Sequence, residues 1–486
     1  MSLTVQTTYG PVEGRDKDGV FLFAGIPYAA PPVGSRRFKA PEPPGSWSET
    51  RVATNFSPAA PQIPSGGMTD NAPVKWDEDC LYLNVSTPAL DDARRPVLVW
   101  IHGGGHRTGQ GAIPWYSGAS FARLGDIVTV SINYRLGALG FTDLSRFGEE
   151  YATSGANGTM DQICALAWVR DNIASFGGDP DKITIAGESA GGFSVATVMA
   201  SPLAAGMFRG AIPQSGAAHH TLTREAAAKV TDLFLEELGA DSIDALHAAS
   251  VDDILAAQAR VDKRAQDPAV QALLRGVAAF YPAQGTPAVP IDPLEAIRAG
   301  QAADARVLIG TNKDEATLLQ EMSDEKLASQ AKRFGSPALV DAYRARYPGA
   351  NATELAIAMS TDQMFRVPCV RLAEAREENP ASKGKTWMYR FDWESRGRLK
   401  STHALEIPFA FNNLDKPGVA VFLGEGPKPQ GVADVMHKAW IDFVRDGNPG
   451  WKAYDLVERT NMRFDEVSSP VADPDDSMRQ AWEGIR

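Results

Sequence analysis

The residues with the clearest chemical potential lie in the segment Gly187-Glu-Ser-Ala-Gly191. This segment follows the apolar run 183–186 and precedes the helix-compatible run 193–200. Glycines on both sides of a serine permit a tight turn from strand to helix, which holds the hydroxyl exposed at the start of the helix. We therefore predict that Ser189 is a nucleophile for acyl transfer. The alternative is a glycine-rich turn at a sheet edge with no catalytic role.

A second glycine-rich motif, His102-Gly-Gly-Gly105, follows the apolar run 97–101. Acyl transfer develops negative charge on the substrate carbonyl oxygen, and each donor fixed in advance can lower the barrier by about 3 kcal/mol. Backbone N–H groups of such a loop can reach that oxygen, and the residue after the nucleophile supplies another. We predict that Gly104, Gly105 and Ala190 form an oxyanion hole. A glycine hinge without a ligand is the alternative.

A serine hydroxyl needs a base and an orienting acid, which follow a strand-to-helix serine in the order acid, then histidine. Of the seven histidines, the late ones, His403 and His437, leave room for an acid between. His437 lies on the apolar face of a helix predicted over 432–444, where a packed or solvated histidine is the simpler interpretation. His403 lies in a turn downstream of a strand predicted over 387–391, and we predict that it is the base.

The acid is expected near a strand end between the serine and the histidine. A strand is predicted over 306–309, and the adjacent carboxylates Asp314 and Glu315 follow it. Spacing alone does not choose between these two residues.

The elements that must position these groups alternate along the chain, which indicates a mostly parallel sheet covered by helices. Residues 1 to about 90 are rich in proline and glycine and are expected to form antiparallel edge strands and long loops. We predict a helical insertion over 223–299, with the tail 281–290 as a loop over the site. The predicted strands cover 97–101, 127–132, 183–186, 306–309 and 387–391.

Length and charge exclude several classes of protein. The chain has 486 residues, with 48 Lys and Arg against 60 Asp and Glu. The acidic balance argues against nucleic acid and anionic membranes as partners, because both require basic patches. No signal peptide or transmembrane segment is visible, so we expect a cytoplasmic monomer that acts on a small molecule. Length alone suggests about three domains, but the predicted site joins residues 103–403, so 1–486 is predicted to be a single catalytic domain.

The chain resembles the type-B carboxylesterase and cholinesterase family of α/β-hydrolases. The resemblance runs through nearly the whole chain in the family's order, and it implies a large, mostly parallel central sheet flanked by helices, with helical insertions around the active site. The segments that carry it are 23–28, 37–38, 78–84, 102–105, 133–137, 161–162, 168–173, 176–180, 187–192, 214–216, 314–315 and 403–409.

The resemblance implies roles for individual residues. The second acid of the pair, Glu315, matches the triad member, Glu188 matches an electrostatic neighbour of the histidine, and Ser215 matches a supporting residue behind the triad. No metal or organic cofactor is implied. Two pairs of charges match buried ion pairs that lie outside the site, Arg135 with Asp161 and Arg37 with Glu78.

Two departures from the family bear on the expectations. Cys80 matches a disulfide cysteine of secreted members, but its partner position is Ala60, which favours a reducing compartment. His106 replaces a residue that is usually aromatic, so either the acyl-side wall is more polar or His106 and Arg107 face solvent. The pocket is expected to be apolar and to include the loop after the glycines and the segment around Phe365.

We therefore interpret the sequence as that of a serine carboxylic ester hydrolase for small to medium, largely apolar esters, acting through an acyl-enzyme. A carbamate or aryl-amide hydrolase on the same triad is the alternative. A non-catalytic cholinesterase-like binding protein is disfavoured, because such members lose a triad residue and this chain keeps all of them.

Overall fold

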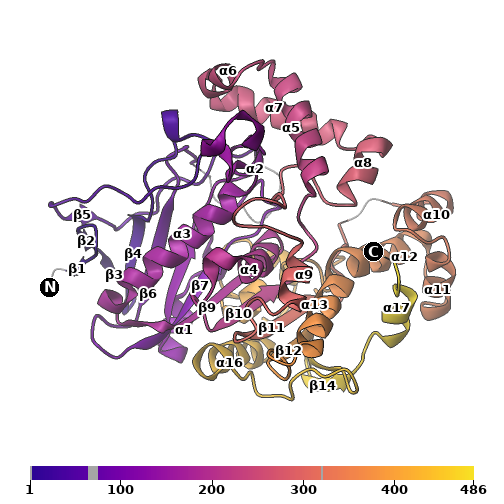
Figure 1. The fold of residues 1–486 in the computed structure, drawn as a ribbon. Coiled ribbons are helices and arrows are strands. Elements are labelled where there is room, and N and C mark those ends of the chain that lie inside the picture. Colours follow the sequence, from indigo (N-terminus) through magenta and orange to yellow (C-terminus); the bar gives the residue numbers. More distant parts are fainter. Residues whose placement is uncertain (1–2, 64–74, 319–320, 486) are drawn as a thin grey trace.

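The computed structural model describes residues 3–63, 75–318 and 321–485, and an eleven-stranded sheet forms its centre (Figure 1). The strand order is β14-β13-β12-β11-β10-β9-β7-β8-β6-β4-β3. Strands from β8 to β13 in this order pair in parallel, and antiparallel strands flank them at both edges. The predicted large, mostly parallel sheet is confirmed.

The strands of this sheet are β3 (Arg15–Lys17), β4 (Val20–Pro27), β6 (Tyr82–Thr87), β7 (Arg95–Ile101), β8 (Val128–Ile132), β9 (Gly178–Glu188), β10 (Gly210–Gln214), β11 (Arg306–Asn312), β12 (Thr386–Phe391), β13 (Thr460–Phe464) and β14 (Ser469–Ala472). A small second sheet contains β1 (Thr4–Gln6), β2 (Pro11–Glu13) and β5 (Arg51–Val52). Every strand predicted from the sequence is present. Strand β10 was not predicted, because Pro213 and small residues weaken its pattern.

Helices cover both faces of the sheet, and β7 shows how the two faces separate. Val97, Val99 and Ile101 belong to the core that includes α3 (Asn157–Asn172), α4 (Ala190–Ala200) and α13 (Val367–Glu378), whereas Leu98 and Trp100 belong to the core that includes α1 (Ala119–Gly125) and α16 (Gln430–Asp446). Successive side chains of a strand point to opposite faces. A run of apolar residues in β7 therefore serves both cores.

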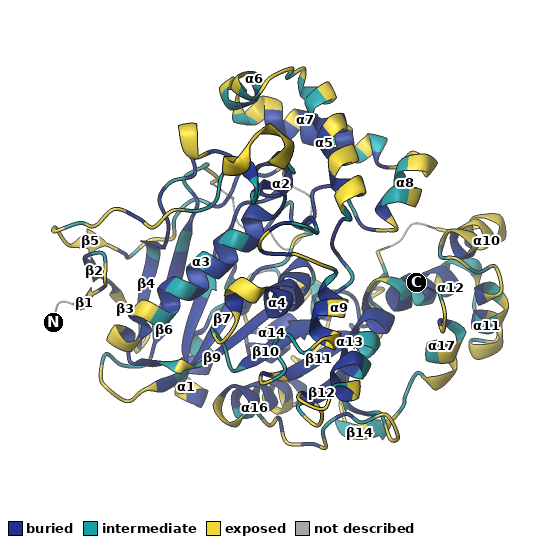
Figure 2. Ribbon diagram, in the orientation of Figure 1, coloured by how far each residue is buried: buried dark blue, intermediate teal, exposed yellow. Residues whose placement is uncertain are grey.

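Two groups of helices extend beyond the sheet layers (Figures 1 and 2). The first follows β10 and contains α5 (Arg224–Leu238), α6 (Ile243–Ala248), α7 (Val251–Arg264) and α8 (Pro268–Leu274). The next helix, α9 (Pro293–Arg298), packs against α4 and α13 in the layer that covers the sheet. The second, not predicted from the sequence, contains α10 (Asp324–Arg333), α11 (Leu339–Arg346) and α12 (Ala352–Thr361), which share a separate apolar core with α17 (Asp476–Ala481). The remaining α-helices are α2 (Gly137–Phe141), α14 (Ile407–Ala410) and α15 (Val419–Leu423).

Among the described residues, no helix combines the length and the apolar character needed to cross a membrane.

Candidate active site

Ser189 lies in a sharp turn between β9 and α4, with backbone angles φ 57° and ψ −124°. Ser189 is partly exposed, whereas the residues on either side of it are buried. A Cβ atom on Gly187 would come within 2.6 Å of the backbone of Gly191, and one on Gly191 within 2.1 Å of the carbonyl oxygen of Ile101. Both glycines are therefore required for the close packing that presents the serine at the start of α4.

The glycine loop after β7 lies directly against this serine. A Cβ atom on Gly103 would be 3.2 Å from the Cβ atom of Ser189. The next residues have positive φ angles, 109° at Gly104 and 62° at Gly105, and the carbonyl oxygen of Gly104 accepts the N–H of Thr108 at 3.0 Å. These conformations favour glycine and fold the loop into a tight turn beside Ser189, where we predict the oxyanion donors.

Glu315 and His403 are joined by a short hydrogen bond, 2.6 Å between the Glu315 carboxylate and Nδ1 of the histidine. The other oxygen of Glu315 accepts the Ser215 hydroxyl at 2.6 Å and the Asn312 backbone N–H at 2.8 Å. The carboxylate is buried, with 2% of the residue exposed. Two donors, Ser215 and Asn312, therefore fix the carboxylate, which in turn fixes the imidazole ring of His403.

The competing candidates have other contacts. Asp314 is only partly buried, and its carboxyl group faces the ammonium groups of Lys313 and Lys400 rather than the histidine. His437 is buried in α16, where its Nδ1 contacts the carbonyl oxygen of Ala410 at 2.8 Å. The geometry therefore brings Glu315, not Asp314, to His403, and it leaves His437 as a packed histidine.

Buried carboxylates surround the imidazole of His403. Oε1 of Glu188 lies 3.2 Å from its Nε2. Burial lowers the pKa of His403, but the carboxylates of Glu188 and Glu315 outweigh burial and raise the pKa to about 10. Burial raises the pKa of Glu188 to about 8, although the histidine opposes this shift. The two groups titrate as a pair, and the effect of the carboxylates on the histidine is to favour its charged form.

The contact between Glu188 and His403 predicts a pH effect. The imidazole accepts a proton only when neutral, so a raised pKa moves the acid limb of kcat/KM to higher pH. Glu188→Gln removes an attracting carboxylate, and we expect the acid limb to move down by about 1 pH unit or more. Hydrolysis of a nitrophenyl ester, measured from about pH 5 to about pH 11 with the uncatalysed rate subtracted, checks this shift. An unchanged acid limb would contradict it, and Asp314→Asn is the control that leaves it in place.

His106 does not face solvent, so that interpretation is wrong for this residue. Only 1% of it is exposed, and its ring packs against Tyr281 at 4.8 Å and Phe141 at 5.0 Å between ring centres. Burial, together with His102 and Arg107, lowers the pKa of His106 to about 3, so the ring is neutral. Arg107 is partly exposed and forms an ion pair with Asp262.

His106 predicts a stability effect, because neither ring nitrogen has a hydrogen-bond partner among the described residues. An unsatisfied buried polar group costs about 1–3 kcal/mol. Phenylalanine keeps the aromatic contacts without those nitrogens, so His106→Phe should raise the free energy of unfolding by about 1 kcal/mol, as measured by denaturant titration. The matched variant His102→Phe should lower it, because Nδ1 of His102 contacts the Gly103 carbonyl oxygen at 2.8 Å. A destabilised His106→Phe protein would show that the ring nitrogens are satisfied.

Aromatic rings continue from His106 to the histidine of the site. Tyr281, in the loop predicted to lie over the site, packs near Phe193 at 6.4 Å, and Phe193 lies 6.3 Å from Phe365. The ring of Phe365 lies 4.7 Å from that of His403. The predicted pocket residue Phe365 therefore contacts the site directly, and His106 joins the same aromatic wall through Tyr281.

A polar group behind the histidine was missed by sequence reasoning. Glu406 is fully buried and accepts hydrogen bonds from Asn312 Nδ2 at 2.7 Å and Gln214 Nε2 at 3.1 Å. Burial raises the pKa of Glu406 to about 7. Its position in the sequence, three residues after His403, could have indicated that it lies near the histidine.

The ion pairs expected outside the site are present. Arg135 and Asp161 are 2.7 Å apart, and Arg37 and Glu78 are 2.6 Å apart. Arg37, Arg135 and Asp161 are buried, and Glu78 is partly buried. Both ion pairs lie apart from Ser189 and His403.

The sequence of residues 1–469 matches the carboxylesterase family. The chain belongs to this family. The para-nitrobenzyl esterase of Bacillus subtilis is 38% identical over 98% of this chain and 97% of its own. The phenmedipham hydrolase of Pseudarthrobacter oxydans is 37% identical, over 91% of this chain and 90% of its own.

Solved carboxylesterase structures share the fold. The carboxylesterase of Geobacillus stearothermophilus superposes with a TM-score of 0.87 at 37% identity, covering 99% of this chain and 100% of the other. A thermophilic para-nitrobenzyl esterase gives a TM-score of 0.88 at the same identity, covering 99% of both chains. The predicted α/β-hydrolase fold is therefore confirmed, and the chain is a carboxylic ester hydrolase of this family.

Proposed function

We propose that Ser189, His403 and Glu315 form the catalytic triad of this esterase and act on small to medium, largely apolar esters. The observation that carries the proposal is the 2.6 Å hydrogen bond from His403 to a buried carboxylate, on an imidazole whose other nitrogen faces the nucleophile turn at Glu188. A triad is recognised by such geometry and roles rather than by sequence position.

The proposed reaction begins when the Ser189 oxygen attacks the acyl carbon and its proton passes to Nε2 of His403. Glu315 holds the imidazole through Nδ1 and stabilises the imidazolium. The N–H groups of Gly104, Gly105 and Ala190 receive the developing oxyanion. The C–O bond then breaks, the alcohol leaves with the proton from His403, and water releases the acid from the acyl-serine by the same steps.

Apolar substrates are supported by the aromatic wall beside His403. Phe193, Tyr281 and Phe365 are each less than 8% exposed and come from separate segments of the chain. Such walls bind apolar groups, while a few polar groups set orientation. The name of one relative, para-nitrobenzyl esterase, supports an ester with an aromatic group as a substrate.

The test is a panel of nitrophenyl esters of increasing acyl length, with an aryl carbamate and an anilide, combined with fluorophosphonate labelling and peptide mass analysis. We expect the highest kcat/KM on short to medium esters and a label on Ser189 alone. Preference for the carbamate or the anilide would replace the substrate proposal. Labelling at another serine would overturn the proposed nucleophile.

We further propose that residues 1–486 act as one catalytic unit, with 223–299 as a cap-like part of it. Support comes from the wide sequence span of the groups that meet at the site, from the oxyanion loop to His403.

We also propose that the protein is a monomer in the cytoplasm. Cys80, Cys164 and Cys369 are all free thiols, and a reducing compartment suits them. Size-exclusion chromatography with light scattering tests the oligomeric state.

A further inference from the structure

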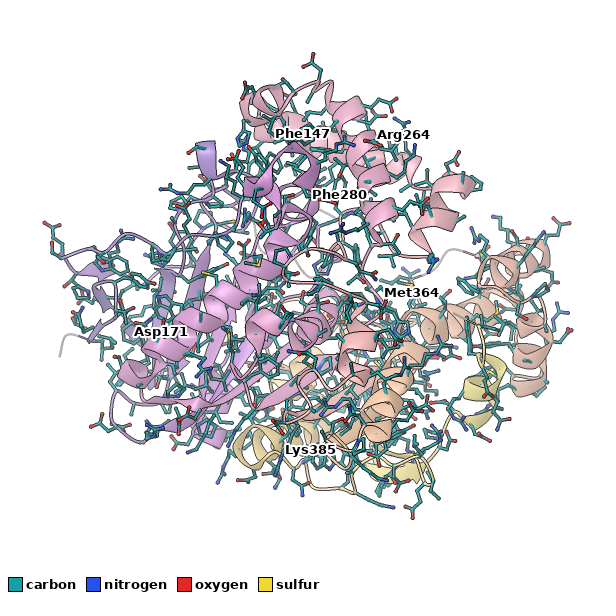
Figure 3. All side chains as sticks on the ribbon, viewed as in Figure 1. Phe147, Asp171, Arg264, Phe280, Met364 and Lys385 are labelled. Atoms are coloured by element: carbon teal, nitrogen blue, oxygen red, sulfur yellow. The ribbon has the colours of Figure 1, made fainter. Side chains whose placement is uncertain are left out.

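A buried ionic network lies behind the acid and the histidine, centred on Arg366. This residue ends η9 (Asp362–Arg366), a π-helical turn inserted between α12 and α13. Pro368 explains the wider turn, because a proline carries no N–H for the carbonyl group four residues before it. Inserted π-helical turns are rare and occur frequently at functional sites. Figure 3 labels Met364, the middle residue of this turn.

The Arg366 side chain reaches the strand end that carries the acid. Its Nη2 donates to the carbonyl oxygen of Lys313 at 2.7 Å and lies 3.4 Å from that of Asn312. Asn312 in turn donates its backbone N–H to the Glu315 carboxylate. The guanidinium therefore holds the backbone immediately before Glu315, although it does not contact Glu315 itself.

The same turn also supports the histidine. Phe365, the neighbour of Arg366, lies with its ring 4.7 Å from the His403 ring. Thr361, the last residue of α12 and the one before η9, accepts the backbone N–H of Ala316, the residue after Glu315, at 3.3 Å. Residues 361–366 thus contact the backbone on both sides of Glu315 and the ring of His403.

Acidic residues hold the guanidinium in place. Asp362 pairs with Nη1 of Arg366, and the hydroxyl group of Tyr343 in α11 donates to Asp362. Asp475 lies 3.5 Å from Nε of Arg366 and accepts a hydrogen bond from Arg390 at 2.7 Å. The side chains of Arg366 and Asp362 are 8% and 1% exposed. The charge of the guanidinium is therefore balanced by neighbouring carboxylates rather than by solvent.

The C-terminal segment completes the network. Asp475 precedes α17, and Trp482, which follows α17, donates its indole N–H to the Tyr343 hydroxyl at 2.8 Å. Both residues lie beyond 469, where the match to the carboxylesterase family ends. Tyr343 comes from the helical group α10–α12, which was not predicted from the sequence. Two peripheral parts of the chain therefore meet on the turn that supports the site.

We propose that Arg366 is a positioning residue for the triad and that Asp475, from the C-terminal segment, sets its orientation. This inference rests on the proposed function. Arginine suits the role because its planar guanidinium binds several acceptors in fixed directions, whereas lysine presents one ammonium group. If Arg366 moves, Glu315 and Phe365 lose the supports that align His403, and misplacement by about 1 Å can cost about 100-fold in rate.

The test compares Arg366→Lys and Asp475→Asn with Arg376→Lys. Arg376 lies in α13, the helix that follows η9 directly; it is fully buried and binds the carbonyl oxygens of Ala302 and Ala305, away from the triad. We expect Arg366→Lys to lower kcat about 10- to 100-fold and Asp475→Asn about 3- to 10-fold, with KM changed less than about 3-fold. The acid limb of the kcat profile should move to lower pH in both variants. Arg376→Lys should reduce thermal stability and keep kcat within about 2-fold.

A second readout needs no substrate. The Nδ1 proton in the short His403–Glu315 hydrogen bond should give a downfield NMR resonance, present in wild type and Arg376→Lys and shifted or lost in Arg366→Lys and Asp475→Asn. Both network variants could instead lose stability while kcat, the pH of the acid limb and this resonance stay as in wild type. Arg366 would then have only a structural role, and the proposal would be overturned. If wild type hydrolyses no ester, the proposed function fails, and the resonance alone decides the positioning role. Should Arg366→Lys fail to fold, the partly exposed Asp475→Asn decides.

Discussion

Ser189→Ala is expected to lower kcat for ester hydrolysis by about 10⁵- to 10⁶-fold, because no other group can form the acyl-enzyme. Residual turnover above the uncatalysed rate should remain, since the oxyanion donors and the binding wall are unchanged. The measurement is the steady-state rate on a short-chain nitrophenyl ester, with protein prepared free of wild-type carry-over. Fluorophosphonate labelling of the same sample should disappear.

The control for Ser189→Ala is Ser194→Ala, on the same helix. Ser194 is buried, and its hydroxyl accepts a hydrogen bond from Gln162 at 2.9 Å, away from His403. We expect Ser194→Ala to keep kcat within a few-fold. Both variants should retain a cooperative thermal transition, which separates lost chemistry from lost folding. Substantial ester turnover by a folded Ser189→Ala protein would end the assignment of the nucleophile.

The parts of the site that local sequence determines were the parts that could be predicted. The turn at Ser189 needs glycines within a few residues of the serine, between a strand and a helix, and all of these signals lie in one short segment. The glycine loop after β7 is equally local. The structure places Gly103 beside Ser189, as these two patterns together require.

Contacts between distant segments were less accessible. The resemblance to a family, rather than spacing, favoured Glu315 over Asp314. In the structure the two side chains differ because Ser215 and Asn312 draw Glu315 inward, while lysines face Asp314. The network around Arg366 joins β11, α11 and the C-terminal segment, and no periodic pattern in the sequence indicates such a meeting.

Two of the helices that were not predicted have recognisable starts in the sequence. The helices α10 and α12 begin at standard caps: the Ser323 side chain accepts the Lys326 N–H, and Asn351 forms a capping box with Glu354. Such caps before amphipathic runs predict helix starts. His106 is buried because its ring packs against Phe141 and Tyr281. The tertiary fold places these two residues, so local sequence could not predict the burial.

The second large effect concerns the acid, for which Glu315→Gln should lower kcat by about 10³- to 10⁴-fold. In the proposed mechanism, Nδ1 of His403 donates its proton to the Glu315 carboxylate, which lies 2.6 Å away, and Nε2 is left free to take the serine proton. Glutamine can turn its amide NH₂ group toward Nδ1, because its carbonyl oxygen still satisfies Ser215 and Asn312. The ring would then carry its proton on Nε2 and could not act as a base.

Asp314→Asn is the matched variant, since it makes the same change of charge and shape at the neighbouring position. Its carboxyl group does not contact His403, so kcat should stay within about 3-fold of wild type. The two rates, measured at the pH optimum of wild type, decide between the acids. A large loss in Asp314→Asn with little change in Glu315→Gln would reassign the triad acid. In that case, the hydrogen bonds from Ser215 and Asn312 to Glu315 would only stabilise the turn that follows β11.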